Sequence, residues 1–263
     1  MKSWIDIGKA ALRYELTGDG PTTLVLVHEM GGTLDSWDHV LPALAQGRRV
    51  LRYDTRGAGQ SEKLRGAITF DAMADDLKGL LDALAIGRVS LAGCAVGAAI
   101  ALHFAARNPN RAAGVVAMGP ATGVPPERRP QILALADNVR RVGMRGIVDA
   151  SFSTSYPPEV RHDPEHYAQF RARWLAGDPD SYAAIYSMLA DADIVGGFSR
   201  IACPVLLLAG TLDRLRPPDS VRQLTDIIPG ARFRALDSGH FMAVQTPARV
   251  AGLIVSFLAE IGA

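Results

Sequence analysis

The sequence contains little cysteine, no excess of charge of either sign and no long apolar run. Its two cysteines, Cys94 and Cys203, lie in apolar, strand-like segments and do not suggest a disulfide framework. The formal net charge is +1, and no basic block gives an electrostatic reason to expect nucleic acid. No stretch approaches the roughly 18 apolar residues of a membrane helix, and residues 1–16 lack a signal-peptide core. We therefore expect a cytoplasmic protein without a nucleic-acid or membrane partner.

Signatures of cofactors and metals are missing as well. There is no phosphate-binding glycine loop and no H-E-x-x-H helix. Only His162 and His166 are four residues apart, and Pro164 between them argues against a helical pair of metal ligands. Both histidines are expected at the surface. We predict no metal and no cofactor, and a small molecule as the partner; the sequence leaves a homodimer open.

What the sequence does contain is an alternation of strand and helix patterns. Strands are expected at residues 4–16, 22–27, 49–53, 89–92, 114–118, 204–209 and 231–236. Helices are expected at residues 35–44, 70–84, 98–104, 220–228 and 247–261. This order predicts an α/β fold with a doubly wound, mainly parallel sheet.

The alternation stops between about residues 121 and 199, where helical stretches rich in proline and arginine replace the strands. A segment of this length between two strands of one sheet is too long for a simple loop. We predict a core domain made of residues 1–121 and 199–263, with residues 122–198 inserted as a helical cap.

Residues 93–97, Gly-Cys-Ala-Val-Gly, have the pattern of a nucleophile elbow that lacks its nucleophile. The segment follows a short apolar strand and precedes a helix, and its glycines flank one central residue, as in G-x-S-x-G. The central residue is Ala95, whose methyl group is not a nucleophile. If the elbow were centred on Cys94, the β-branched Val96 would occupy a tight position of the turn. Cys94 is therefore interpreted as a small buried residue beside the site.

Two polar residues follow later strands in the order expected for the rest of a catalytic triad. Asp213 comes shortly after the strand ending near Gly210, and His240 follows the next strand. The order nucleophile, acid, histidine, each after a strand, indicates a triad. His240 is predicted to be the general base and then the general acid, and Asp213 to fix its tautomer.

The segment His-Glu-Met-Gly-Gly at residues 28–32 follows the strand at residues 22–27. Its position predicts that the backbone N–H of Met30 is one donor of an oxyanion hole. The N–H of Val96, after the central residue of the elbow, is the second. Such donors stabilise the charged oxygen of a tetrahedral intermediate, typically by about 3 kcal/mol each.

With these residues the chain resembles the α/β-hydrolase fold superfamily over essentially its whole length. Residues 54–61, Asp-Thr-Arg-Gly-Ala-Gly-Gln-Ser, match that family's D-x-R-G-x-G-x-S loop, interpreted as a structural turn. Within the superfamily, residues 140–146, 178–184 and 189–193 resemble the cap of 3-oxoadipate enol-lactonase and its relatives. The resemblance implies hydrolysis of a small lactone or ester. The departures are His28-Glu29, absent from that branch, and the lack of its usual tryptophan near Phe152.

Substrate contacts are predicted from Glu29, Met118 and Phe241. Glu29 could orient an amide or ammonium group of a substrate, or pair with an arginine at the surface, and we favour the surface pair. The many arginines of the predicted cap make a carboxylate-bearing substrate plausible. Hydrolysis of an amide, or of a carbon–carbon bond in a β-diketone, is the alternative on the same triad.

Ala95 itself admits two hypotheses. In the first, the natural protein is a serine hydrolase, and this chain carries an engineered serine-to-alanine change that leaves it inactive. In the second, the protein is a natural non-catalytic member that only binds a ligand. The first is favoured, because a binding protein does not require a strained elbow, an acid, a histidine and an oxyanion loop together.

Overall fold

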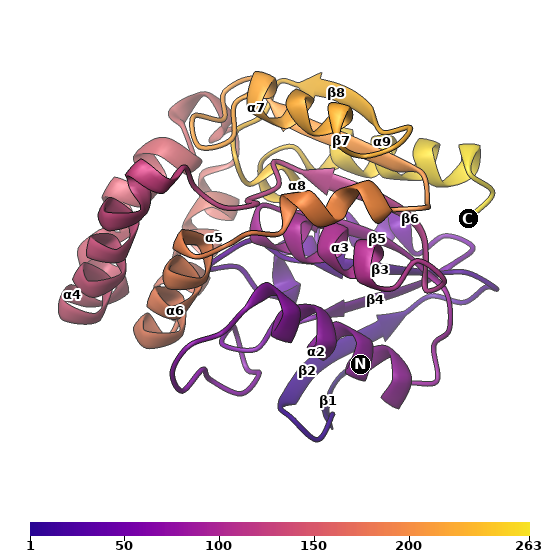
Figure 1. Cartoon of the computed structure of the whole chain (residues 1–263), viewed down its shortest axis with the longest axis horizontal. Helices are drawn as coiled ribbons and strands as arrows, with labels where there is room; N and C mark the ends of the chain where they lie inside the picture. The colour runs from indigo at the N-terminus through magenta and orange to yellow at the C-terminus, as the bar shows by residue number, and fades with distance from the viewer.

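The computed structural model describes residues 1–263 and is built around one eight-stranded sheet (Figure 1). The strands are Lys2–Asp6 (β1), Ala11–Thr17 (β2), Thr23–Val27 (β3), Arg49–Tyr53 (β4), Val89–Cys94 (β5), Ala112–Met118 (β6), Val205–Gly210 (β7) and Arg232–Leu236 (β8). Their order in the sheet is β1-β2-β4-β3-β5-β6-β7-β8. The β1–β2 and β2–β4 pairs are antiparallel and all others are parallel, which confirms the predicted mainly parallel α/β sheet.

The helices connect these strands. The α-helices are Leu41–Leu44 (α1), Phe70–Ala83 (α2), Val96–Arg107 (α3), Arg129–Ser155 (α4), Pro164–Leu175 (α5), Pro179–Ala190 (α6), Pro218–Arg222 (α7), Met242–Gln245 (α8) and Pro247–Glu260 (α9). Short 3₁₀ helices are Leu34–Trp37 (η1), Pro126–Arg128 (η2), Pro158–Val160 (η3), Val195–Arg200 (η4) and Gln223–Asp226 (η5). None of the helices is both long enough and apolar enough to cross a membrane.

Two hydrophobic clusters cover the two faces of the sheet. One joins strand residues to α2, α3 and α7, and the other joins strand residues to α1 and α9. The strands β3, β5 and β7 are buried along their whole length, which explains their continuous apolar sequences. A sheet covered on both faces leaves the ends of its strands as the place for a site.

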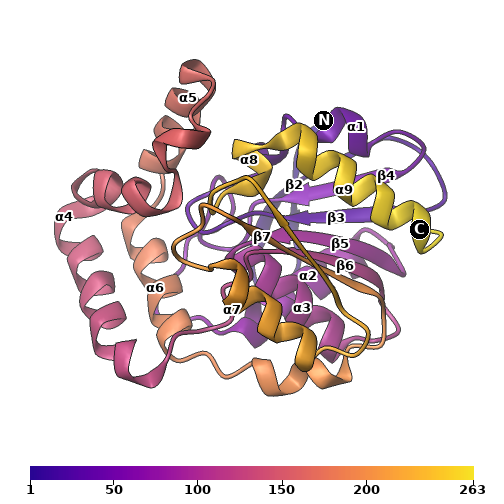
Figure 2. The ribbon, with the colours of Figure 1, turned by 90° about the horizontal axis from the view of Figure 1, so that it is seen from above.

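No strand lies between β6 and β7, where the chain forms η2, α4, η3, α5, α6 and η4. In Figure 2 the helices α4, α5 and α6 stand to one side of the sheet and its flanking helices. The long helix α4 is interrupted at Gly143, whose φ of 69° and ψ of 177° are not helical. Glycine reaches this positive φ without the steric cost that a side chain brings.

Three predicted elements were wrong in extent. The strand expected at residues 4–16 is two antiparallel strands, because Gly8, with φ of 79°, and the carboxylate of Asp6 form a turn. The helix expected at residues 35–44 is broken into η1 and α1; Pro42 has no N–H for a continuous helix and instead lies in the first turn of α1. The helix expected at residues 220–228 is α7 followed by η5.

Candidate active site

The elbow between β5 and α3 is a strained turn. Ala95 has φ of 52° and ψ of −115°, a conformation that L-residues rarely adopt. Its N–H donates to the carbonyl of Met118 (2.8 Å), and its own carbonyl accepts from the N–H of Ala121 (3.0 Å). A Cβ at Gly93 would lie 2.4 Å from the carbonyl oxygen of Gly97, and one at Gly97 would lie 2.2 Å from that of Val27. Only glycine fits these two positions, so the geometry of the elbow is retained although its central residue is alanine.

Ala95→Gly should stabilise the fold by about 1 kcal/mol, because glycine adopts a positive φ without the strain that alanine experiences. This net gain in the free energy of unfolding is the strain that glycine relieves minus the stability that is lost because glycine has more conformational freedom in the unfolded chain. Urea unfolding gives the free energy directly. The matched control is Ala99→Gly inside α3, which should destabilise by about 1 kcal/mol. A loss of stability in Ala95→Gly as large as in the control would contradict the assignment of strain to position 95.

His240 and Asp213 form a buried pair at the ends of neighbouring strands. Nδ1 of His240 lies 2.8 Å from Oδ2 of Asp213, and the two residues are 6% and 3% exposed. Because a carboxylate only accepts, Nδ1 carries the hydrogen and Nε2 is left as the basic nitrogen. The other carboxylate oxygen, Oδ1, accepts from the backbone N–H groups of Leu215 (2.8 Å) and Arg216 (2.9 Å). Asp213 is thereby held in place while it orients the imidazole.

Two backbone N–H groups close to the elbow have no acceptor in the protein. The N–H of Val96 begins α3 and so has no acceptor within the helix. The N–H of Met30, in the loop after β3, donates to no backbone carbonyl. These are the two donors predicted for an oxyanion hole, and both residues line the same cavity as His240.

This cavity, which we call the His240 cavity, has a volume of about 160 Å³. Ala95, Phe241 and His240 line it together, and most of the remaining lining is apolar, from the loop after β6 and from α4 and α6. The structure thus brings Ala95, His240, Met30, Val96 and Phe241 together. The structure contradicts a substrate contact from Met118, since its side chain is fully buried in a core cluster and is not part of the lining of the cavity beside His240.

Cys94 lies beside the backbone of His240. It is fully buried, and its Sγ lies 3.4 Å from the backbone oxygen of His240 rather than near the ring. Burial, with the nearby carboxylate of Glu29, raises the pKa of this thiol well above its usual value. A thiolate is therefore disfavoured at this position, in agreement with the interpretation of Cys94 as a small core residue.

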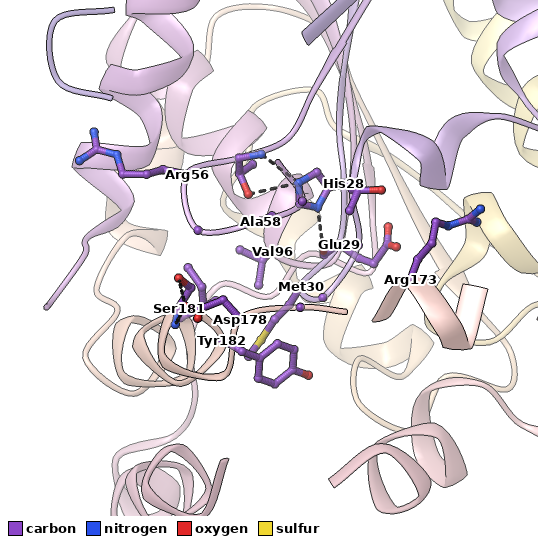
Figure 3. A pocket seen from close by; sticks show the side chains of 18 of the residues that line it. His28, Glu29, Met30, Arg56, Ala58, Val96, Arg173, Asp178, Ser181 and Tyr182 are labelled. Atoms are coloured by element: carbon purple, nitrogen blue, oxygen red, sulfur yellow. Dashed lines mark hydrogen bonds between the residues drawn. The ribbon is translucent and has the colours of Figure 1, made fainter. Parts of the chain in front are cut away.

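A second cavity, which we call the Glu29 cavity, lies on the other side of the oxyanion loop and has a volume of about 210 Å³. It shares Met30, Val96 and Tyr182 with the His240 cavity, so these three residues form the wall between them. Figure 3 shows the three side chains close together, with Glu29 and Arg173 on the same side of them.

The expected surface pairing of Glu29 with an arginine was wrong. Glu29 is 1% exposed, its Oε1 accepts from the hydroxyl of Ser36 (2.6 Å), and its Oε2 has no partner. A Cβ at Gly32 would lie 2.2 Å from Oε1 of Glu29. The absence of a side chain at Gly32 therefore lets the carboxylate fold back under the loop. Sequence spacing alone could not reveal this, because it depends on how the loop curls.

The loop at residues 54–61, interpreted above as a structural turn, is held by hydrogen bonds to neighbouring segments. The carboxylate of Asp54 accepts from the N–H groups of Leu34 and Gln60, at 2.8 Å each, and from Arg13. Nε2 of His28 accepts from the N–H of Thr55 (3.0 Å), while Nδ1 lies 2.7 Å from the carbonyl of Glu29 (Figure 3). His28 therefore joins this loop to the oxyanion loop.

The arginines of residues 122–198 are mostly used elsewhere. Arg129, Arg140 and Arg171 form ion pairs with aspartates on the surface. Arg128 lines the His240 cavity and Arg173 lines the Glu29 cavity. His166, expected at the surface, is instead buried in α5, where Nε2 lies 3.0 Å from the carbonyl of Val244. Pro164 at the start of α5 does not interrupt the helix, because it lies in the first turn.

Arg216 lines the His240 cavity and was not predicted from the sequence. Its guanidinium donates to the carbonyl oxygens of Gly123 (2.9 Å) and Leu215 (3.1 Å) and forms no ion pair. Burial lowers the pKa of Arg216, although the charge of Asp213 opposes the shift. The feature of the sequence that could have indicated a role for Arg216 is its position three residues after Asp213, on the loop that carries the acid of the pair.

Comparison with known proteins identifies the family. A profile described as alpha/beta hydrolase fold matches residues 22–247, which is most of the chain. The chain belongs to this family of hydrolases.

Individual relatives cover nearly the whole chain. A 2-hydroxy-6-oxononadienedioate/2-hydroxy-6-oxononatrienedioate hydrolase of Paraburkholderia xenovorans is 29% identical over 96% of this chain and 92% of its own. The 3-oxoadipate enol-lactonase 2 of Acinetobacter baylyi is 27% identical over 90% of this chain and 89% of its own. The structure of a thermophilic esterase of Thermogutta terrifontis with bound malate superposes with a TM-score of 0.91 at 28% identity, covering 99% of both chains. The predicted resemblance to the enol-lactonase branch is confirmed.

Proposed function

We propose that this protein is a serine hydrolase in which Ala95 stands where the natural enzyme has its nucleophilic serine, so that this chain is an inactive, engineered form. The observation that carries the proposal is the pairing of His240 with Asp213 beside a strained elbow. The unpartnered N–H groups of Met30 and Val96 supply the oxyanion hole. A protein that only binds its ligand does not need these features together.

In the proposed reaction, serine at position 95 attacks the carbonyl carbon of the substrate while Nε2 of His240 takes the hydroxyl proton. The carbonyl oxygen becomes negatively charged and accepts from the N–H groups of Met30 and Val96. The imidazolium then gives its proton to the leaving group, and water repeats the sequence on the acyl-enzyme. With alanine at position 95 the covalent path is lost and the cavity is kept. The chain should therefore bind ligand without hydrolysing it.

The proposed substrate is a small ester or lactone that bears a carboxylate. The His240 cavity is small and mostly apolar, and its charged side chains are the guanidinium groups of Arg128 and Arg216 beside the imidazole of His240. A guanidinium without an acidic partner, partly removed from water, favours a carboxylate ligand. The names of two relatives contain nonadienedioate and 3-oxoadipate, and the esterase structure holds malate, so each of these names refers to a carboxylate-bearing compound.

We include in the proposal that residues 122–198 form a cap over a core made of residues 1–121 and 199–263. Helices α4 and α6 contribute Ile132, Ser155, Tyr186 and Leu189 to the His240 cavity. An amide, or the carbon–carbon bond of a β-diketone, is the alternative substrate, because the same three residues can cleave it. A screen of esters, lactones, amides and diketones with Ala95→Ser distinguishes these substrates, and activity on none of them would contradict the proposed function.

Arg216→Gln, made together with Ala95→Ser, should raise KM for a carboxylate-bearing ester about 10- to 100-fold. The reason is that a charge-assisted hydrogen bond is typically worth about 1.5–3 kcal/mol. For a neutral ester of the same size, KM should change less than about threefold. The matched control is Arg214→Gln, because Arg214 is exposed and lies outside the His240 cavity. Steady-state kinetics on the ester pair tests this, and an equal loss for both esters would remove Arg216 as the carboxylate contact.

A further inference from the structure

The carboxylate of Glu29 is buried beside a cavity, and only one of its two oxygens has a partner in the protein. Glu29 is 1% exposed and lines the Glu29 cavity. Its Oε1 accepts from the hydroxyl of Ser36 (2.6 Å), whereas its buried Oε2 has no partner. Buried carboxylates without a cationic partner are rare, because removing the charge from water is costly. The arrangement therefore favours a cationic ligand group that reaches Oε2 from the cavity.

The guanidinium of Arg173 supplies the opposite charge in the same cavity. Arg173 comes from α5 and lies on the same side of Met30 as Glu29 (Figure 3). Unlike Arg171, whose guanidinium donates to Asp149 (2.9 Å), Arg173 forms no ion pair and no hydrogen bond in the structure. The carboxylate and the guanidinium are not paired with each other either, so both charges are available to a ligand.

Close packing between α5 and the oxyanion loop fixes the positions of these two charges. Trp174, the residue after Arg173, is fully buried, and a Cβ at Gly31 would lie 2.3 Å from its Nε1. Gly31 has φ of 78°, which glycine adopts without strain. Because Gly31 is two residues after Glu29, this contact holds the helix that carries the guanidinium against the loop that carries the carboxylate.

The other charged side chains of the Glu29 cavity already have partners in the protein. Arg13, Asp35 and Arg56 form ion pairs, and the carboxylate of Asp178 accepts from the N–H of Ser181 (2.8 Å). Much of the remaining wall is apolar, from Met73, Val96, Ile100 and Ile185. The cavity thus offers one free negative charge, one free positive charge and an apolar surface.

We propose that the Glu29 cavity binds a small zwitterion, an aliphatic amino acid whose ammonium and carboxylate are joined by a short carbon chain. The ammonium donates to Oε2 of Glu29, the carboxylate accepts from the guanidinium of Arg173, and the carbon chain contacts the apolar wall. At about 30 Å³ for each water-sized group, a volume of about 210 Å³ has room for about seven such groups. Two lining residues, Gln60 and Ala176, are exposed, which leaves the cavity accessible from solvent.

The two free charges require both charges in one ligand. A simple amine would pair with Glu29 but would be repelled by the guanidinium of Arg173, and a simple carboxylate would be repelled by Glu29. Like charges placed next to each other reduce affinity, whereas a zwitterion compensates both side chains. This inference goes beyond the proposed function, because the site is a different cavity and binding requires neither His240 nor serine at position 95.

Isothermal titration calorimetry of the unsubstituted chain with glycine, 3-aminopropanoate and 4-aminobutanoate tests the inference. At least one of these should bind with a Kd below about 1 mM, and butanoate and 1-aminobutane should each bind at least about tenfold more weakly than it does. Glu29→Gln and Arg173→Gln should each weaken binding about 10- to 100-fold, the usual loss when one partner of a charge-assisted hydrogen bond is removed.

Arg171→Gln and Glu165→Gln are the matched controls, since both residues lie on α5 and line neither cavity. Their affinities should stay within about twofold of that of the unsubstituted chain.

Stability separates a binding role of Glu29 from a structural one. The amide oxygen of a glutamine can still accept from Ser36, and the substitution removes an unpaired buried charge. Glu29→Gln should therefore unfold at a urea concentration equal to or above that of the unsubstituted chain. If Glu29→Gln instead unfolds more easily and keeps the affinity, Glu29 serves only the fold and the inference is wrong. If Glu29→Gln does not fold, Arg173→Gln provides the test.

Absence of binding by all three amino acids, or unchanged affinity in either Glu29→Gln or Arg173→Gln, would overturn the inference. If Arg216→Gln removes the binding and Glu29→Gln does not, the ligand occupies the His240 cavity and the inference is again wrong. Because calorimetry requires no turnover, hydrolysis by Ala95→Ser can succeed or fail without changing this result, and the two proposals are tested separately.

Discussion

Ala95→Ser should convert this chain into an ester hydrolase, with kcat/KM for activated esters at least about 10³-fold above that of the unsubstituted chain. The magnitude follows from the cost of removing the nucleophile from a complete triad, which is usually of this size or larger. The gain should occur mainly in kcat, because the cavity already exists and only the covalent path is restored. A stopped-flow burst of the phenolate from a p-nitrophenyl ester, with an acyl adduct in the intact mass, measures it.

The control for this prediction is the unsubstituted chain, together with Cys94→Ala made in the Ala95→Ser background. Cys94 is buried with its sulfur directed to the backbone oxygen of His240, so its removal should leave the burst intact. If the unsubstituted chain itself shows a burst that Cys94→Ala removes, the nucleophile has been assigned to the wrong residue. If Ala95→Ser gives neither burst nor turnover on any ester, the natural protein does not use a serine nucleophile at this position to cleave esters.

Asp213→Asn in the Ala95→Ser background should lower kcat about 10⁴-fold while leaving KM within a few-fold. The physical reason is the tautomer: an asparagine amide can donate to Nδ1, which moves the imidazole hydrogen to Nε2 and removes the base. The short contact of 2.8 Å between Nδ1 and Oδ2 makes this exchange of donor and acceptor direct. Single-turnover acylation rates separate it from any effect on product release.

Asp237→Asn provides the matched comparison, because Asp237 also follows a strand of the sheet but is exposed and pairs with Arg249. Its kcat should stay within about twofold of the parent, the usual range for an exposed ion pair. A loss below tenfold in Asp213→Asn would mean that Asp213 does not orient the imidazole, and the triad would then need a different acid.

The sequence predicted the parts of the site that depend on chain order. Ala95, Asp213 and His240 each follow a strand, and parallel strands bring their carboxyl ends to one edge, so their meeting could be foreseen. The glycines at 93 and 97 could be predicted for the same local reason, since strand and helix pass within van der Waals contact there. Met30 and Val96 followed from the elbow and from the loop after β3.

Other features depend on how loops fold back, and no local pattern encodes that. Glu29 curls under its own loop to reach Ser36, so a carboxylate expected at the surface is buried. Met118 ends a strand beside the elbow, but the pleat directs its side chain into the core. Arg216 reaches the cavity because its guanidinium bends to the carbonyl of Gly123, nearly a hundred residues earlier in the chain. Each outcome was fixed by tertiary contacts that alternation and spacing do not contain.

The wall that Met30 shares with Val96 and Tyr182 has a consequence for how this scaffold can diversify. In the proposed reaction Met30 donates its backbone N–H to the reacting oxygen, whereas its thioether side chain helps to separate the His240 cavity from the Glu29 cavity. Replacing that side chain with a shorter one would join the two cavities into one longer cavity and would leave the backbone N–H of residue 30 in place. The length of an accepted ligand and the ability to stabilise its charge therefore reside in different atoms of one residue, and can vary independently.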